Sequence, residues 1–366
     1  MTSPNPILLA LGLSALVASH SNAQTYTAVD LTPTGSGAAS AISAGQAAGY
    51  VSALANAFTG RATLWTVDGA IDLHPDALVG PGRSVVNGVA GDLQVGSAAG
   101  TATGNRNVPV AWRDTAASAT VLSIPFVNAG GQASATDGIQ IVGSAIGYNR
   151  DGTTLGSAHA LIWDVATGVA TDIGTDANLL GVGGGQQVGI VFKNLATAAL
   201  WRGTKTYTSL HPKNAVVSYA GATDGHWQVG YAGFDIRVRQ EAANGNKDKR
   251  FNYAYVWSGT AASGVNIHPY ASSADGAALE SSYALSVAGG NIAGYATLST
   301  GTTTIGRPRA IVWDSNLQAT DLQAFVPAGF VSSVAYAVDA EGNVAGVMTA
   351  ADGSRHAVLW VFNPAQ

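Results

Sequence analysis

A short apolar segment that ends in tryptophan recurs along most of the chain. Small apolar residues fill the positions before each Trp, and Ala lies three residues upstream in every copy except one, which has Pro109. The seven copies end at Trp65, Trp112, Trp163, Trp201, Trp257, Trp313 and Trp360. Neighbouring copies are 38 to 56 residues apart, close to the ~40–50 residues of a β-propeller blade. We therefore expect one tryptophan strand in each of seven blades, with the Trp side chains in the core.

A pair of glycines precedes each tryptophan segment. The pairs are Gly45 and Gly49, Gly91 and Gly96, Gly138 and Gly143, Gly185 and Gly189, Gly225 and Gly230, Gly290 and Gly294, and Gly342 and Gly346. The first glycine is placed as in a tight hairpin turn, which requires a positive φ angle. The second falls within a strand, where glycine usually marks the close approach of another backbone.

A third segment, usually with Asp before Leu or Ile, follows six of the seven tryptophans. These copies cover residues 71–73, 122–124, 171–173, 208–210, 265–267 and 320–322, while the seventh copy, residues 29–31, stands at the start of the chain. Each repeat thus contains four strands, and the last repeat lacks its fourth. Pairing the first strand into the last blade would close the ring and remove exposed edges.

We predict an all-β fold: a closed seven-bladed β-propeller of four-stranded blades, with the N-terminal strand completing the last blade. One domain would cover residues 24–366. An eight-bladed ring and an open β-solenoid are the alternatives, although a solenoid would need atypical capping repeats.

The composition suits many short strands joined by tight turns. The chain has 46 Gly, and charged residues make up only 11% of it, whereas disorder requires many charges and few apolar residues. There is no Cys, which excludes disulfides, thiolate nucleophiles and Cys-ligated zinc. The net charge of −5 argues against nucleic acid and anionic membrane surfaces as partners. We expect a monomer.

The N-terminal segment resembles an export signal. Residues 7–18 form an apolar run, and Ser21-Asn22-Ala23 provides small residues suited to cleavage. The run is too short for a helix that crosses a bilayer. We therefore predict a signal peptide over residues 1–23 and a secreted or periplasmic protein, although the segment before the run lacks Lys and Arg.

The repeats resemble the HAF-type bacterial extracellular repeat family. The resemblance rests on the small-apolar segment before Trp, best seen at Ser157–Trp163 and Arg355–Trp360, and it covers nearly all of the predicted mature chain. This sequence has Trp where the family name implies Phe. The resemblance implies export and a repetitive β-fold, and it implies no catalytic residues.

Insertions are expected on one face of the ring, between the second and third strands of a blade. The longest runs from Phe234 to Phe251 and carries most of the positive charge, at Arg237, Arg239, Lys247, Lys249 and Arg250. It is either a solvated loop or a clamp for an acidic ligand, such as a uronate or a sulfated glycan, because Arg and Lys pair with such anions.

Histidines fall into two groups. His74, His211 and His268 follow the fourth-strand segment, where they either end the strand or contact a ligand. His159 and His356 lie four residues before a Trp, a position that other blades fill with Arg61, Tyr253 and Arg309. His159, Tyr253, Arg309 and His356 could abstract a proton beside an acidic sugar, with Arg61 binding substrate. Because Asp30, Asp72, Asp172 and Asp321 share a repeat position, we expect them to bond locally.

Two functions of different class remain open. The first is an extracellular binding or interaction protein, whose ligand could be an acidic polysaccharide or a cell-surface glycan. The second is a polysaccharide lyase that cleaves uronate-containing glycans by β-elimination, a reaction that needs no carboxylate pair. We expect no cofactor and no metal, since no His, Asp and Glu residues follow a metal-ligand spacing.

Overall fold

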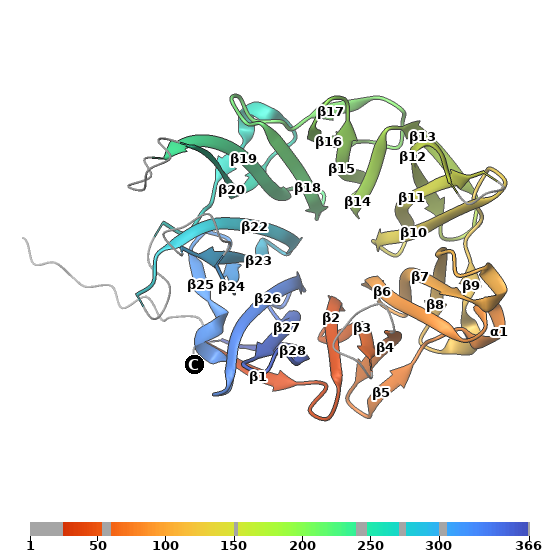
Figure 1. Ribbon diagram of the computed structural model, residues 1–366, viewed down its shortest axis with the longest axis horizontal. Helices are drawn as coiled ribbons and strands as arrows, with labels where there is room; N and C mark the ends of the chain where they lie inside the picture. The colour runs from red at the N-terminus through yellow and green to blue at the C-terminus, as the bar shows by residue number, and fades with distance from the viewer. Residues whose placement is uncertain are drawn as a thin grey trace, which may run out of the picture.

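Seven four-stranded antiparallel sheets are arranged in a ring (Figure 1). The computed structural model describes residues 25–52, 60–149, 153–238, 247–270, 276–299 and 306–364. The predicted seven-bladed propeller is confirmed, and the eight-bladed ring and the open solenoid are excluded. The predicted signal peptide lies outside the described residues. Within the described ranges, no helix is long and apolar enough to cross a membrane.

The first four blades follow the chain in order. Blade 1 contains β2 (Ser36–Ser43), β3 (Gln46–Ser52), β4 (Arg61–Thr66) and β5 (Gly69–Asp72). Blade 2 contains β6 (Gly82–Ala90), β7 (Leu93–Gly100), β8 (Val108–Arg113) and β9 (Thr120–Val121). Blade 3 contains β10 (Ala129–Thr136), β11 (Gln140–Tyr148), β12 (Thr154–Asp164) and β13 (Ala170–Thr175). Blade 4 contains β14 (Ala177–Gly183), β15 (Gln186–Phe192), β16 (Ala196–Trp201) and β17 (Tyr207–Ser209).

The last three blades bring the chain back to its start. Blade 5 contains β18 (Val217–Thr223), β19 (Gln228–Val238), β20 (Lys247–Trp257) and β21 (Val265–Asn266). Blade 6 contains β22 (Leu279–Ala288), β23 (Asn291–Leu298), β24 (Pro308–Trp313) and β25 (Ala319–Asp321). Blade 7 contains β26 (Phe330–Val338), β27 (Val344–Ala350), β28 (Arg355–Asn363) and β1 (Thr25–Asp30). Short helical turns lie between blades or strands: α1 (Asp76–Val79), η2 (Thr101–Thr103), η3 (Ala116–Ser118), η4 (Ala261–Ser263) and η5 (Leu322–Phe325).

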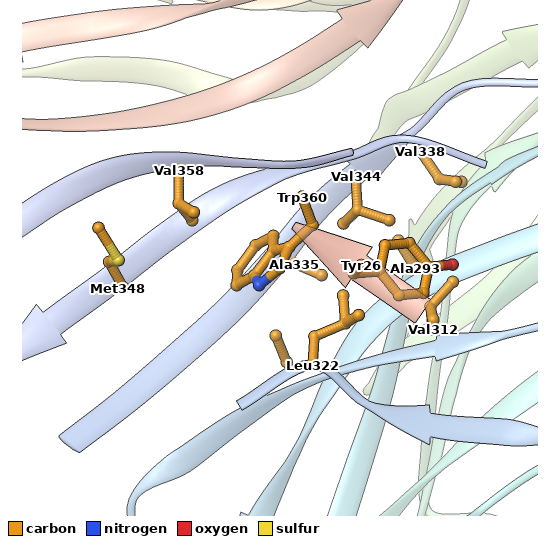
Figure 2. Packing of buried hydrophobic residues seen from close by; sticks show 11 residues of the cluster. Tyr26, Ala293, Val312, Leu322, Ala335, Val338, Val344, Met348, Val358 and Trp360 are labelled. Carbon is orange, nitrogen blue, oxygen red and sulfur yellow. The ribbon is translucent and has the colours of Figure 1, made fainter. Parts of the chain in front are cut away.

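The ring closes because β1 pairs antiparallel with β28. Ala28 lies opposite Trp360 in this pairing, and the Leu31 amide donates to the Ala357 carbonyl at 2.9 Å. Tyr26 of β1 packs in the same buried cluster as Trp360 (Figure 2). The predicted displacement of the fourth strand is therefore confirmed.

Both glycines of each pair have the predicted role. The turn glycine has a positive φ in all seven blades, for example 77° at Gly45, a conformation that L side chains rarely adopt. The strand glycine leaves no room for a side chain: a Cβ at Gly49 would lie 2.0 Å from the Ala38 carbonyl oxygen of the neighbouring strand. The second strand therefore packs against the innermost strand at a point where only glycine fits.

The seven repeat tryptophans lie in the core, as predicted. Six are no more than 2% exposed, and Trp65 is 6% exposed. The indole of Trp163 donates to the Ser123 carbonyl of the preceding blade at 2.6 Å, and Trp313 donates to Ile267 in the same way at 2.8 Å. These aromatic side chains therefore pack one blade on the next.

The strand order gives the ring two distinct faces. Turns between strands one and two and between strands three and four lie on one side, called here the glycine-turn face. Connections between strands two and three and between successive blades lie on the other side, called here the insertion face. The β19–β20 hairpin joins strands two and three of blade 5, so strand order places the longest predicted insertion on the insertion face. Figure 1 shows this hairpin projecting outward from the ring.

Candidate functional site

In four of the seven blades, the residue four positions before the Trp is Arg or His and contacts a carboxylate within its own blade. The partner is the Asp of the fourth strand, and the pairs are Arg61–Asp72 (2.7 Å), His159–Asp172 (2.6 Å), Arg309–Asp321 (3.0 Å) and His356–Asp30 (2.8 Å). The other carboxylate oxygen of each Asp accepts a backbone N–H two residues further on. The predicted local bonding of these aspartates is confirmed.

The predicted catalytic residues are distributed over the ring. His159 lies in blade 3, Tyr253 in blade 5, Arg309 in blade 6 and His356 in blade 7. In blade 5 the position of the Asp is taken by Asn266, which donates to the Tyr270 hydroxyl at 2.8 Å. The arrangement therefore supports strand pairing inside each blade, and the structure does not gather the four residues around one point.

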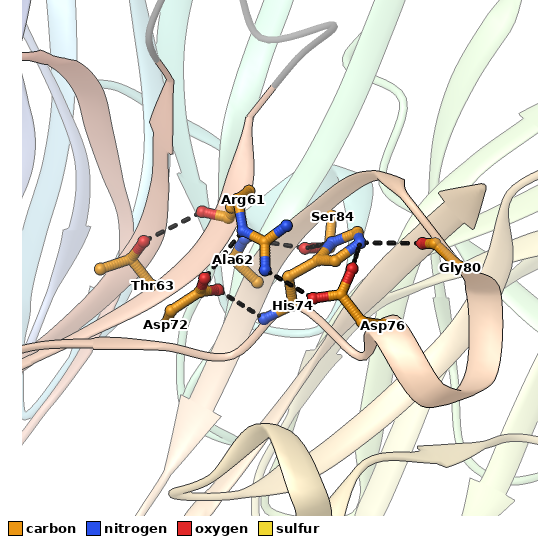
Figure 3. Close-up of polar contacts among 8 residues, drawn as sticks. All are labelled: Arg61, Ala62, Thr63, Asp72, His74, Asp76, Gly80 and Ser84. Atoms are coloured by element: carbon orange, nitrogen blue, oxygen red, sulfur yellow. Dashed lines mark hydrogen bonds and ion pairs between the residues drawn. The ribbon is translucent and has the colours of Figure 1, made fainter.

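His74, His211 and His268 join one blade to the next. Figure 3 shows the first of these contacts: His74 Nδ1 lies 2.8 Å from Ser84 Oγ of blade 2, and Nε2 lies 3.2 Å from the Gly80 carbonyl. Ser84 Oγ accepts the backbone N–H of Ala62 at 2.8 Å. His211 pairs with Ser218 and His268 pairs with Ser282 in the same manner. This geometry gives the three histidines a structural role at blade boundaries.

Two residues of the basic cluster, Lys249 and Arg250, are paired with carboxylates. Arg250 binds Asp235 through two nitrogens at 2.7 and 3.0 Å, and Lys249 binds Glu280 of blade 6 at 2.5 Å. Arg237 and Lys247 lie in the strands of the hairpin, where Arg237 faces Asp248 in the backbone register. Arg239 lies outside the described residues.

Aromatic rings gather on blade 5 beside the Lys249–Glu280 pair, with the Lys249 ammonium 5.4 Å from the centroid of the Phe251 ring. Tyr253 is surrounded by Phe234, Phe251, His268 and Tyr270, with centroid separations of 4.9 to 6.5 Å. Tyr270 is 74% exposed. Burial raises the pKa of Tyr253 above its ordinary value, and the neighbouring Tyr270 and Glu280 add to the shift. Tyr253 is therefore a neutral phenol at neutral pH.

We refer to Phe234, Phe251, Tyr253 and Tyr270 as the blade 5 aromatic platform. Of these four residues, the sequence indicates only Tyr253 as a candidate site residue, whereas Phe234 and Phe251 mark the ends of the predicted insertion. The available signal is the pattern Phe251-x-Tyr253-x-Tyr255, because alternate residues of a strand share one face. Tyr270 carries no such signal, since it follows the strand and reaches the platform only through the fold.

Among the described residues, no group of three or more His, Asp or Glu side chains could hold a metal ion. The pairs that do form consist of one histidine and one aspartate, as at His159–Asp172. The platform therefore offers a ligand aromatic faces and tyrosine hydroxyl groups, with the Lys249–Glu280 ion pair beside it.

Solved structures share the propeller fold at low sequence identity. The β-propeller domain of the Trilobed protease from Pyrococcus furiosus, described as having an open velcro topology, matches with a TM-score of 0.54 and 12% identity over 90% of this chain and 95% of that one. A Pyrococcus horikoshii acylaminoacyl peptidase matches with a TM-score of 0.55 and 12% identity over 90% of this chain, which spans 52% of the peptidase. An oligogalacturonate lyase in complex with manganese matches with a TM-score of 0.53 and 10% identity, covering 93% and 96% of the two chains. These likenesses show the fold alone.

No family model matches the sequence, and no curated protein does. The class of protein is therefore set by the structure: a closed seven-bladed β-propeller of four-stranded blades. The resemblance to HAF-type repeats stays a prediction.

Proposed function

We propose that this protein is an extracellular glycan-binding propeller whose ligand lies on the blade 5 aromatic platform. The observation that carries the proposal is the exposed Tyr270 ring beside Tyr253, with centroids 6.2 Å apart. Sugar rings present apolar C–H faces that pack on aromatic side chains, while hydroxyl groups at the ring edge form hydrogen bonds. The predicted export of the chain agrees with a ligand outside the cytoplasm.

One charged residue lies on the same side of the hairpin as the platform. The Lys249 ammonium is 5.4 Å from the centroid of the Phe251 ring and is paired with Glu280. Arg250 and Asp235 alternate with Phe251 and Phe234 along their strands, so they lie on the opposite side of the hairpin. Because Glu280 already matches the Lys249 charge, a uronate gains little from it. The aromatic contact supplies more of the affinity than the charge does.

Binding of trigalacturonate and of its methyl ester, measured by calorimetry, tests the proposal. The ester keeps the sugar rings and removes the charges. We expect both to bind, with affinities within about tenfold of each other, because the nearby cations are already paired. Tyr270→Ala should weaken both by about tenfold, since stacking on an exposed ring is lost.

Phe192→Ala is the matched control. Phe192 is an exposed aromatic residue at the end of β15 in blade 4, 42% exposed, and its loss should leave binding unchanged. If neither sugar binds, or if Tyr270→Ala binds as tightly as the parent protein, the platform is not the site. Binding that is confined to the acid and lost with added salt would place the ligand on the basic cluster instead.

A second candidate is a polysaccharide lyase, favoured by the fold shared with oligogalacturonate lyase. In such a reaction the neutral phenol of Tyr253 would donate a proton to the leaving oxygen, because its raised pKa disfavours the phenolate. Ultraviolet absorbance of the unsaturated product decides between the two functions. A lyase forms this product and loses it in Tyr253→Phe while still binding the sugar, whereas a binding protein forms none.

A further inference from the structure

The innermost strand of every blade contains a β-bulge at the same position. The register against the second strand shifts by one residue at Ser40, Asn87, Ser134, Leu180, Gly221, Leu285 and Tyr336. A bulge leaves one residue unpaired and turns its side chain away from the regular alternation of the strand. Seven repeats of one bulge therefore redirect seven residues in an equivalent way.

All seven bulged residues line one central cavity of about 440 Å³. The cavity opens toward the glycine-turn face, where the turn residues Ala44, Ala340 and Glu341 also border it. Its size falls within the range of ~300–1,000 Å³ that is typical of small-molecule sites. It lies at the ring axis, apart from the blade 5 aromatic platform on the insertion face.

The chemical type of the bulged residue differs among the blades, whereas the residue before it is always aliphatic. These preceding residues are Ala39, Val86, Ala133, Leu179, Ala220, Ala284 and Ala335. The bulged residues are instead polar in blades 1 to 3, apolar or glycine in blades 4 to 6, and Tyr in blade 7. The bulge therefore has the same position in every blade, while the different residue types give the cavity one polar side and one apolar side.

The polar side retains hydrogen-bonding capacity. Ser40 Oγ donates to the Val86 carbonyl, and Asn87 Nδ2 donates to the Ala133 carbonyl at 2.8 Å. Continuing round the ring, Ser134 Oγ is buried and has no hydrogen-bond partner among the described residues. A buried polar group without a partner is unfavourable, and rotation of the Ser134 side chain toward the cavity would let a ligand bind its hydroxyl.

Negative charge dominates the face on which the cavity opens. Its turns and adjoining strand ends carry nine carboxylates in the described ranges, namely Asp68, Asp92, Asp114, Asp137, Asp164, Asp224, Asp314, Asp339 and Glu341, against three cations, Arg113, Arg202 and Lys205. The cavity itself is bordered by Asp339 and Glu341 and by no Lys or Arg. Such a field attracts cations and repels anions.

We propose that the central cavity binds a small amphipathic cation, with an apolar ring against Leu180 and Leu285 and a nitrogen-bearing group toward Asn87 and Ser134. The bulges position seven of the residues that line the cavity, and the negative charge of the glycine-turn face favours a positively charged ligand. This site is independent of the glycan platform.

Benzamidine and benzoate test this site because they share their shape and differ in the sign of their charge. Ligand-observed NMR titration should give saturable benzamidine binding with a Kd on the order of 1 mM, and benzoate should bind at least about tenfold more weakly. Ser134→Ala should weaken benzamidine binding several-fold, since it removes the unpaired hydroxyl. Tyr270→Ala should leave benzamidine binding unchanged.

Gly221 provides a blocking variant and its control. A Cβ there meets nothing closer than 3.5 Å, so Gly221→Ala should fold and retain binding, whereas Gly221→Phe should fill the cavity and lose it by at least about tenfold. Leu180→Phe narrows the cavity from the neighbouring blade if Gly221→Phe does not fold. Equal binding of the two probes, absence of saturable binding, or full binding by the folded blocking variant would overturn the proposal.

Discussion

His268 Nδ1 lies 2.9 Å from Ser282 Oγ, across the boundary between blades 5 and 6. Ser282 Oγ also accepts the backbone N–H of Ala254 at 2.9 Å. Burial lowers the pKa of His268, so the imidazole is neutral at neutral pH. One buried imidazole thus connects three strands of two blades, and this connection recurs at His74 and His211.

Stability should fall in mild acid because of His268. Burial lowers its pKa to about 4, against an opposing hydrogen bond with the backbone of Leu279. The unfolded chain, with a His pKa near ~6.5, therefore binds more protons than the folded chain between these two values. The free energy of unfolding should decrease by up to about 3 kcal/mol as the pH falls from about 6.5 to about 4, as measured by urea denaturation.

His268→Gln is the control for this pH effect. Blade 6 already has glutamine at the equivalent position, where Gln323 Oε1 accepts the Ser333 hydroxyl at 2.7 Å. The variant should keep the contact to Ser282 and lose most of the pH dependence between 4 and 6.5. A denaturation profile as steep as that of the parent protein would assign the dependence to other groups.

Ser84→Ala should destabilise the boundary between blades 1 and 2. The substitution leaves the Ala62 N–H and His74 Nδ1 without their shared partner in a buried site, and unpaired buried groups cost about 1–3 kcal/mol. Thermal unfolding measures the loss. Ser315→Ala, at an exposed position, should change stability by less than about 0.5 kcal/mol.

Gly230→Ala should be strongly destabilising, whereas Gly221→Ala should not. A Cβ at Gly230 would lie 1.8 Å from the Tyr219 carbonyl oxygen, but the nearest atom at Gly221 is 3.5 Å away. The first change forces two strands apart, at a cost above about 3 kcal/mol. The second restricts the unfolded chain and is expected to stabilise by up to about 1 kcal/mol. Similar unfolding midpoints for the two variants would contradict the close strand contact.

A disulfide between positions 27 and 361 should lock the ring. Thr27 and Val361 are paired in the β1–β28 register, which places antiparallel Cα atoms ~4.5–5.5 Å apart, within disulfide range. Because the chain has no Cys, Thr27→Cys with Val361→Cys can form only this bond. We expect about 2–4 kcal/mol of stabilisation that is lost on reduction. Persistent free thiols under oxidising conditions would show that the two strands are not paired.

The sequence predicts most of the fold because each blade repeats local signals. Gly45 and Gly49 show where the first hairpin turns and where two strands touch, and Trp65 shows which strand faces the next blade. Asp30 shows that the fourth strand of the last blade comes from the N-terminal end of the chain. The candidate sites were harder to predict. His159 and His356 carry the residue types of acid–base chemistry, but each is engaged by the Asp of its own blade.

The sequence by itself determined the number of blades, the order of their strands and the closure by β1, since these follow from patterns that repeat along the chain. Tertiary structure alone decided which side chains meet. Asn87, Ser134 and Leu180 lie in separate repeats, and only bulges in neighbouring blades turn them toward one cavity. Tyr270 reaches Tyr253 only because the chain folds back after β21. Sequence periodicity shows which residues occupy equivalent positions in the repeats. Whether their side chains meet depends on the three-dimensional packing of the blades.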